Sequence, residues 1–275
     1  MKTRSAFLGI AVLAFILASC GGGKQGKINT PADLKGKVIG TISTGVSDKS
    51  KFDQTTAYIG AEPKEILPFN KRSDLLAAVL SGKIDAFHAP KIVAEFYAKR
   101  NDNLKIIEPK DPFEAEIVMA VRIDDVKLKS DLDSAITVLQ GNGTMKVLED
   151  KWITNLPASN EPAFEATPKI GNAKTIYVGV SGDFAPLDYI AADGRPAGFN
   201  VALLAEIGKM LNVNFEVVSI ESQAKFAALF SKKIDAVFFQ MYGNQFKHLY
   251  PDMKSKFLAT IPYYKGQSGY FLVKK

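Results

Sequence analysis

Cysteine, histidine and tryptophan are scarce in this chain: its 275 residues include one Cys, two His and one Trp. A single cysteine leaves no pair for a disulfide, so the fold must depend on its hydrophobic core. His88 and His248 are far apart in the sequence and neither is close to Cys20, so the spacing typical of a metal site is missing. Runs of arginine with interleaved aromatic residues are also missing. This argues against a nucleic-acid partner despite the formal net charge of +6.

Long apolar runs are missing beyond the N-terminus, where nothing approaches the ~20 apolar residues that span a bilayer. At the N-terminus, Lys2 and Arg4 precede an apolar run over residues 6–18, and Leu17-Ala18-Ser19-Cys20 resembles the lipobox of bacterial lipoproteins. The pattern predicts a lipoprotein signal peptide over residues 1–19, lipidation of Cys20, and a lipid anchor with a flexible tether over residues 20–30. The alternative is an ordinary secretory signal that happens to contain a cysteine. The predicted location is the bacterial cell envelope, on the extracytoplasmic side of a membrane.

One stretch occurs twice. Residues 75–87 read LLAAVLSGKIDAF and residues 226–237 read FAALFSKKIDAV, with seven identities at an offset of 150 positions. Each copy has the pattern of an apolar helix end, a short polar break and an apolar strand that begins Ile-Asp-Ala. Gly82 provides a left-handed helix cap in the first copy, whereas Lys232 stands there in the second, so the two turns need not match. The repeat predicts two similar α/β lobes. The alternative is chance similarity between two helix–strand joints.

Strand and helix patterns alternate along most of the chain. Strands are predicted at 38–42, 64–68, 84–88 and 104–107, with Ser73 as the cap of a helix over 74–81 and a further helix after Pro90. After a strand at 117–123 and two helices, residues 155–172 contain three prolines and little periodicity, which indicates a linker. A second series follows, with strands at 175–180, 215–220, 234–239 and 270–273 and with Asn200 as a helix cap.

Several short motifs resemble the family 3 bacterial extracellular solute-binding proteins, the receptors of polar amino-acid ABC transporters. The family's opening motifs correspond to residues 175–186, Gly198-Phe199-Asn200-Val201, residues 232–236 and Pro262-Tyr263-Tyr264. Its later motifs correspond to residues 33–37, then Asn142-Gly143-Thr144 and Lys151-Trp152, yet here these precede the opening motifs. The resemblance implies an α/β fold like that of type II periplasmic binding proteins, with two α/β lobes around a cleft. The exchanged order implies circular permutation.

The permutation predicts specific lobe boundaries. Residues 31–116 would form the family's second lobe, and residues 117–275 its first lobe, with the linker 155–172 joining the family's old chain ends. The new ends would lie at one hinge crossing, and one crossing near Glu116 would join the lobes, because surface termini that lie close together tolerate such a rearrangement. The alternative is a fragment of a longer tandem array read out of frame, against which the signal peptide argues.

The predicted ligand site lies between the lobes, at the carboxyl ends of the strands. Ser43 and Thr44 form a small polar loop before a helix, which suits an anion but also suits an ordinary turn. The resemblance puts Lys247 in place of an arginine that pairs with the ligand carboxylate, and Pro90 in place of an aspartate that holds the ligand ammonium. It also aligns Phe184 and Ser222 with a pair of stacking aromatics, and Ser181 with a common acidic position. Further candidates are Asp183, His88, Gln240 and Tyr242.

The amino-acid clamp of the family is therefore largely absent, and two interpretations stay open. The ligand differs from a standard α-amino acid, or the protein is a sensor or structural partner that no longer binds a small molecule tightly. The fold also occurs in a few dehydratases and lyases, but no convincing acid/base pair is found, so no enzyme is predicted. We expect a monomeric, membrane-anchored protein without cofactor or metal. It would deliver a small polar solute, an amino acid or derivative, to an ABC permease.

Overall fold

The structure is a computed structural model, and it describes residues 27–43, 53, 55–57, 60, 62–159, 162, 169–242 and 256–275. The predicted signal peptide, Cys20 and most of the tether lie outside the described residues, as do Thr44 and Lys247. Over the ranges described, no helix is both long and apolar enough to cross a bilayer.

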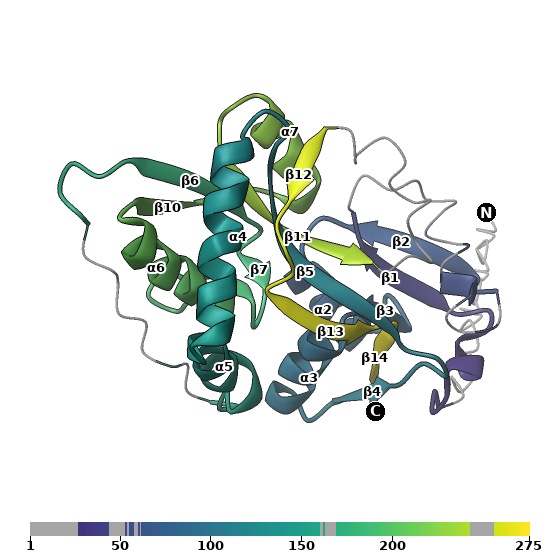
Figure 1. The fold of residues 1–275 in the computed structure, drawn as a ribbon. Coiled ribbons are helices and arrows are strands. Elements are labelled where there is room, and N and C mark those ends of the chain that lie inside the picture. Colours follow the sequence, from purple (N-terminus) through teal and green to yellow (C-terminus); the bar gives the residue numbers. More distant parts are fainter. Residues whose placement is uncertain are drawn as a thin grey trace, which may run out of the picture.

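The first lobe is built on a five-stranded sheet in the order β2-β1-β3-β14-β4 (Figure 1). Strand β1 (Val38–Ile42) is parallel to β2 (Glu65–Phe69) and β3 (Ala86–Ala89), whereas β14 (Tyr270–Lys274) is antiparallel to β3 and to β4 (Leu104–Ile107). Helix α2 (Arg72–Ser81) connects β2 to β3, and α3 (Lys91–Arg100) connects β3 to β4. A short 3₁₀ helix, η1 (Pro31–Leu34), precedes β1.

The second lobe repeats this arrangement in the order β10-β6-β11-β5-β12. Strand β6 (Thr175–Val180) is parallel to β10 (Asn214–Ser219) and β11 (Ala236–Tyr242), whereas β5 (Phe113–Arg122) is antiparallel to β11, β12 (Phe257–Ala259) and β13 (Tyr264–Ser268). The order of the strands and the antiparallel fourth strand are thus common to both sheets, as a duplicated α/β unit requires.

Helices and a small sheet complete the second lobe. Its helical segments are α4 (Val126–Gly141), α5 (Thr144–Glu149), the π-helical turn η2 (Asp150–Thr154), α6 (Phe199–Leu211), η3 (Ser222–Ala224) and α7 (Lys225–Phe230). Strands β7 (Asp183–Phe184), β8 (Asp188–Ile190) and β9 (Pro196–Ala197) form a separate antiparallel sheet. A turn at Asp193-Gly194 joins β8 to β9.

The repeated Ile-Asp-Ala motif makes the same contacts in both lobes. The Asp85 backbone N–H donates to the Val38 carbonyl at 2.8 Å, and the Val38 N–H donates to Asp85 Oδ2 at 2.8 Å. Asp235 exchanges the equivalent pair with Tyr177, at 2.8 Å and 2.9 Å. Each aspartate therefore extends the sheet by one side-chain hydrogen bond at the start of a central strand, which explains why both copies keep it.

The two turns before these motifs also match, which the lysine at position 232 had left open. Gly82 has φ 76° and Lys232 has φ 62°, so both residues adopt the left-handed conformation that closes the preceding helix. The following residues, Lys83 and Lys233, donate their N–H groups to Ala78 and Ala228 at 2.9 Å and 3.0 Å. A lysine accepts this conformation because the surrounding backbone hydrogen bonds fix the turn, at a steric cost of about 1 kcal/mol.

Replacing Lys232 with glycine is therefore expected to stabilise the protein. Relief of the left-handed strain should raise the free energy of unfolding by about 0.5–1 kcal/mol, measured by urea unfolding. Lys233→Gly is the matched control, because Lys233 is absent from the residues with positive φ; glycine there should destabilise instead. Equal changes in the free energy of unfolding at the two positions would contradict a strained, left-handed conformation at Lys232.

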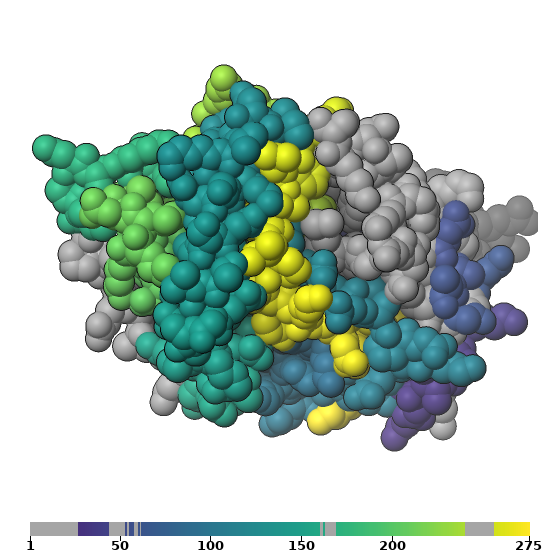
Figure 2. Space-filling view, viewed as in Figure 1, coloured from purple at the N-terminus to yellow at the C-terminus, as the bar shows by residue number. Residues whose placement is uncertain are grey.

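The lobe boundary differs from the prediction. Residues 270–274, which the sequence assigned to the lobe of residues 117–275, form β14 between β3 and β4 in the sheet of the other lobe. Two segments therefore cross between the lobes, one from β4 into β5 and one from β13 through Gly269 into β14, rather than one near Glu116. Strand β5 also begins at Phe113, earlier than predicted, because β13 pairs with residues 113–117. Figure 2 shows C-terminal residues, in yellow, alongside the teal surface of α4.

The two ends of the described chain meet on the first lobe. Ile28 is buried in a small cluster with Phe271 and Val273 of β14. Lys27 and Lys275 line the same pocket of about 140 Å³, and the Lys275 N–H donates to the Asn103 carbonyl at 2.8 Å. Residue 27 and the C-terminus are thus neighbours, which is the arrangement that a circular permutant needs.

Candidate functional site

The clearest polar contact between the lobes joins Arg72 to Asp183. Arg72 is the first residue of α2, just after β2 ends, and Asp183 lies in β7, just after β6 ends. The Arg72 backbone N–H donates to Asp183 Oδ2 at 2.7 Å, and its guanidinium donates to Asp183 Oδ1 at 3.3 Å. The carboxyl ends of parallel strands in the two lobes therefore face each other, where α/β sheets bind their ligands.

An aromatic ring completes this contact. The guanidinium carbon of Arg72 lies 4.1 Å from the centroid of the Phe184 ring, within the range of a cation–π interaction. The Arg72 and Asp183 side chains are only 12% and 17% exposed. The predicted candidates Asp183 and Phe184 are thus together at the interface of the lobes, and they hold a cation that the chain supplies itself.

A buried polar network supports the loop that carries Asp183 and Phe184. Asp188 is 1% exposed and accepts hydrogen bonds from Ser181 Oγ at 3.1 Å, the Gly182 N–H at 3.0 Å and Asn200 Nδ2 at 2.9 Å. Asn200 Oδ1 in turn accepts from the Tyr263 hydroxyl at 2.7 Å. Burial, followed by the nearby negative charge of Asp188, raises the pKa of Tyr263 well above its usual value, so it remains a neutral donor.

Lys225 brings a second cation to this region. Its ammonium donates to the Phe238 carbonyl at 3.0 Å. Burial lowers the pKa of Lys225. The negative charges of Asp188 and Asp183 act in the opposite direction, whereas the positive charge of Arg72 lowers this pKa further. Arg72 and Lys225 therefore lie in the same electrostatic environment as Asp183 and Asp188, which gives the described part of the site balanced charge.

The other predicted residues within the described ranges lie on elements other than α2 and β7. Ser43 follows β1, and its N–H donates to the Phe69 carbonyl at 2.7 Å, as in an ordinary sheet extension. Ser222 begins η3 and is half-buried. Gln240 and Tyr242 lie at the end of β11, opposite Ile117 and Ala115. Pro90, the counterpart of the family's ammonium-binding aspartate, precedes α3 as its N-cap residue.

His88 lies within the first lobe's sheet. It pairs with Phe271 across β3 and β14, and the two rings are 5.4 Å apart. Burial lowers the pKa of His88 to about 4, so the ring is neutral at pH 7. Its neighbours are thus those of a core histidine rather than those of the Arg72–Asp183 contact.

A measurable pH dependence follows from His88. Since its pKa is about 4 in the folded chain and 6.5 when exposed, the unfolded chain binds more protons between these values. Stability should be complete above pH 6.5 and fall by roughly 2–3 kcal/mol as the pH drops to 4. Urea unfolding of wild type and of His88→Gln at several pH values isolates the contribution of His88 to the free energy of unfolding, because the carboxylates titrate alike in both proteins. Parallel curves for the two proteins would contradict it.

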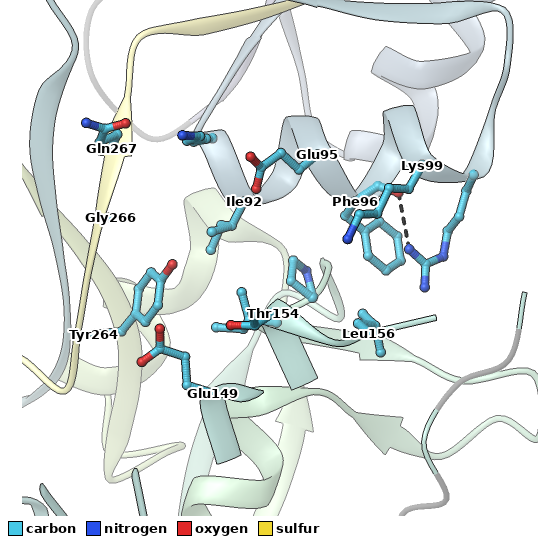
Figure 3. A pocket seen from close by; sticks show the side chains of 14 residues that line it. Ile92, Glu95, Phe96, Lys99, Glu149, Thr154, Leu156, Tyr264, Gly266 and Gln267 are labelled. Carbon is cyan, nitrogen blue, oxygen red and sulfur yellow. Dashed lines mark hydrogen bonds between the residues drawn. The ribbon is translucent and has the colours of Figure 1, made fainter. Parts of the chain in front are cut away.

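A hollow lies between the lobes, away from the Arg72–Asp183 contact. Its volume is about 370 Å³, and α3 forms one wall while β13, α5 and η2 form the other. Figure 3 shows Glu95, Phe96 and Lys99 of α3 facing Tyr264, Glu149 and Thr154 across it. Burial, followed by the charges of Glu149 and Glu95, raises the pKa of Tyr264. None of the residues predicted as ligand contacts lines this hollow.

Sequence reasoning missed Arg72, Asp188 and Lys225. The predicted cap at Ser73 was wrong: α2 begins at Arg72, its N-cap residue Lys71 provides no side-chain hydrogen bond, and the carboxylate of Asp183 takes that role from the other lobe. Asn200 was also predicted as a cap but is the second residue of α6, with its amide buried against Asp188 and Tyr263. Asp188 carried a signal, since an aspartate between Leu187 and Tyr189 interrupts an otherwise apolar stretch.

Comparison with known families confirms the resemblance found in the sequence. Residues 176–275 match the bacterial extracellular solute-binding proteins, family 3. Residues 20–136 match a different family, described as NMT1/THI5 like. The C-terminal part of the chain is therefore similar to the family 3 solute-binding proteins, whereas the N-terminal part is similar to a different family.

Curated relatives carry the same indication. The arginine-binding extracellular protein ArtP of Bacillus subtilis is 31% identical over 133 residues, 48% of this chain and 50% of that protein. The ABC transporter arginine-binding protein 1 of Escherichia coli is 27% identical over 135 residues, 47% of this chain and 52% of that protein. The chain thus spans about half the length of the curated relatives it matches. Among solved structures, the GluR0 ligand-binding core from Nostoc punctiforme with L-glutamate aligns over 87% of this chain and 85% of its own, at 14% identity and a TM-score of 0.44.

Proposed function

We propose that this chain is a membrane-anchored, extracytoplasmic solute-binding protein that delivers a small polar solute, an amino acid or derivative, to an ABC importer. The observation that carries the proposal is the meeting of Asp183 and Phe184 with a guanidinium at the carboxyl ends of strands from two lobes. The family match over residues 176–275 supports it, as do relatives that bind arginine. The lipobox at Cys20 is the basis for the anchor.

The site is suited to a solute that carries a positive charge. Asp183 and Phe184 together provide the carboxylate and the aromatic face that bind ammonium or guanidinium groups. Ser181 contributes through its hydrogen bond to Asp188, and Lys225 supplies a positive charge for a carboxylate. We propose Asp183 and Phe184 as the primary ligand contacts, with Ser222, Ser43 and His88 as more distant candidates that follow only from sequence.

The exchanged order of the motifs supports a circular permutant. Strands β14 and β5 each follow a hinge crossing and take the same, fourth position in two equivalent sheets, and Ile28 packs against Phe271 and Val273. In this arrangement the family's usual connection from β14 into β1 is cut, and residues 155–172 join the ends that are usually free. Closure of the two lobes around the solute would then proceed as in an unpermuted receptor.

A thermal-shift screen tests the proposed function. Amino acids, their derivatives and small cations would be added to the mature chain, and a solute present at about 100 times its dissociation constant should add about 2.7 kcal/mol of stability. Phe184→Ala should abolish the shift for the solute found. The exposed Tyr177 provides the matched control, and Tyr177→Ala should leave the shift intact. A complete screen without any shift would overturn the proposal and favour a sensor or structural protein.

The anchor is tested separately by mass spectrometry of the mature chain from membranes. A diacylglyceryl group on Cys20 as the first residue is expected, and a Cys20→Ser variant should be released into the soluble fraction. A mature chain that begins at another residue would show an ordinary secretory signal instead.

A further inference from the structure

We propose that the guanidinium of Arg72 occupies the cation-binding position formed by Asp183 and Phe184, and that this contact (the latch) holds the two lobes together. A free cationic solute then binds at this position only by displacing Arg72. The inference deepens the proposed function and rests on it for the identity of the displacing solute. The latch itself depends only on contacts within the chain.

Both oxygens of the Asp183 carboxylate are engaged by one residue of the other lobe. The Arg72 backbone N–H donates to Oδ2 at 2.7 Å, and its guanidinium donates to Oδ1 at 3.3 Å. The first of these bonds also caps α2, whose N-cap residue Lys71 offers no side-chain hydrogen bond. A carboxylate of one lobe thus completes a helix of the other, which is possible only while the lobes are together.

The guanidinium is also placed as a bound ligand would be. It stacks at 4.1 Å on the Phe184 ring, and both charged side chains are mostly buried. Partial burial strengthens the attraction between the charges relative to an exposed pair. A carboxylate beside an aromatic face is the arrangement that recognises a planar cation, and here the cation is covalently part of the protein.

A second contact between the lobes keeps this geometry in register. Phe96 of α3 lies 6.2 Å from Tyr189 of β8. Its neighbour Tyr97 lies close enough to Arg72 and Asp183 for their charges to act on its pKa, which burial raises. The charges of Asp188, Arg72 and Asp183 also act on Lys225. The Arg72–Asp183 pair is therefore part of a closed interface rather than a stray surface contact.

Tethering makes Arg72 a strong competitor. A group held by a short covalent connection acts at an effective concentration of about millimolar or higher. A free guanidinium must reach a similar concentration, or gain additional contacts through the rest of the solute, before it replaces Arg72. Removing the Arg72 side chain should therefore open the subsite to free guanidinium and weaken closure of the empty protein.

The experiment combines small-angle X-ray scattering with guanidinium titration of the mature chain. Wild type is expected to keep a compact profile that about 20 mM guanidinium chloride does not change. Arg72→Ala should show a larger radius of gyration, and the same guanidinium concentration should restore the compact value, with sodium chloride as the salt control. The apparent affinity for guanidinium should be at least about tenfold higher in Arg72→Ala than in wild type.

Further variants keep the outcome decisive. Arg72→Gln retains most of the side chain and should also open the lobes, and adding Asp183→Asn to Arg72→Ala should abolish the rescue. Arg195→Ala is the matched control, because the contacts that the described residues show for its guanidinium are with Asp193 in its own turn, and this variant should stay closed. A closed Arg72→Ala variant with the guanidinium affinity of wild type would overturn the latch.

The two proposals fail in different ways. In one outcome, the lobes of the Arg72→Ala variant open and guanidinium closes them again, but no solute stabilises wild type. The latch then stands and the proposed transport function fails. If a solute stabilises wild type and Arg72→Ala equally, and the two scattering profiles coincide, the function stands and the latch fails.

Discussion

Replacing Asp188 with alanine is expected to lower the free energy of unfolding by about 3–5 kcal/mol, as measured by urea unfolding. The carboxylate is almost fully buried and accepts three hydrogen bonds, from Ser181, Gly182 and Asn200. Alanine would leave these donors buried without their acceptor, and it would remove the negative charge that partly offsets the desolvation of Lys225. Leaving buried polar groups unpaired costs more than the lost bonds themselves.

Two further variants show whether the network is the cause. Asp188→Asn keeps one oxygen that accepts from Ser181 or Gly182, but its amide N–H₂ group replaces the second oxygen. We therefore expect the free energy of unfolding to fall by a smaller amount, about 1–3 kcal/mol. Asp193→Ala is the matched control: Asp193 is exposed and pairs with Arg195, and its loss should cost less than about 1 kcal/mol. Equal losses in Asp188→Ala and Asp193→Ala would show that Asp188 holds no such network.

The same network explains why two separate sequence motifs belong together. Asn200 of Gly198-Phe199-Asn200-Val201 and Tyr263 of Pro262-Tyr263-Tyr264 are joined by a hydrogen bond of 2.7 Å, although 63 positions separate them. Both motifs resemble those of a family, and the structure gives them a physical role. They fix the loop from Ser181 to Asp188, on which the proposed ligand contacts lie.

The duplicated lobes were predictable because their signal is local. Alternating strand and helix patterns and the repeated Ile-Asp-Ala each depend on residues close in sequence, and the structure shows the same contacts at Asp85 and Asp235. The conformation of Lys232 was not predictable in this way. Propensity disfavours lysine at positive φ, but backbone hydrogen bonds from neighbouring residues override it.

Sequence reasoning failed where the partner lies in the other lobe. Ser73 is a good helix cap by residue type, yet α2 begins at Arg72, two residues earlier than predicted, because Asp183 caps it across the interface. Strand β14 was assigned to the wrong lobe for a similar reason. Its residues carry a clear strand pattern, but that pattern does not say whether Tyr270–Lys274 pairs with β5 or with β3 and β4.

Replacing Gly198 with alanine is expected to cost about 3–5 kcal/mol of stability. Gly198 has φ 108° and ψ 177°, a region that is essentially restricted to glycine. An added Cβ would lie 2.5 Å from the Leu187 carbonyl oxygen and 2.8 Å from that of Pro186. These are backbone atoms, and both carbonyls already accept hydrogen bonds from the first turn of α6, at Asn200 and Phe199. Neither can move without breaking the link between α6 and this loop.

Gly141→Ala is the matched control for this variant. Gly141 ends α4 with ordinary helical geometry, and a Cβ there would meet nothing within 4 Å. Alanine at that position should be neutral or stabilising by up to about 1 kcal/mol. Urea unfolding of both variants separates strain from the general effect of replacing glycine. Because Gly198 fixes the loop that holds Asp183 and Phe184, we also expect Gly198→Ala to weaken solute binding while the variant is still folded. A variant of wild-type stability would show that the close approach of α6 to Pro186 and Leu187 is not required.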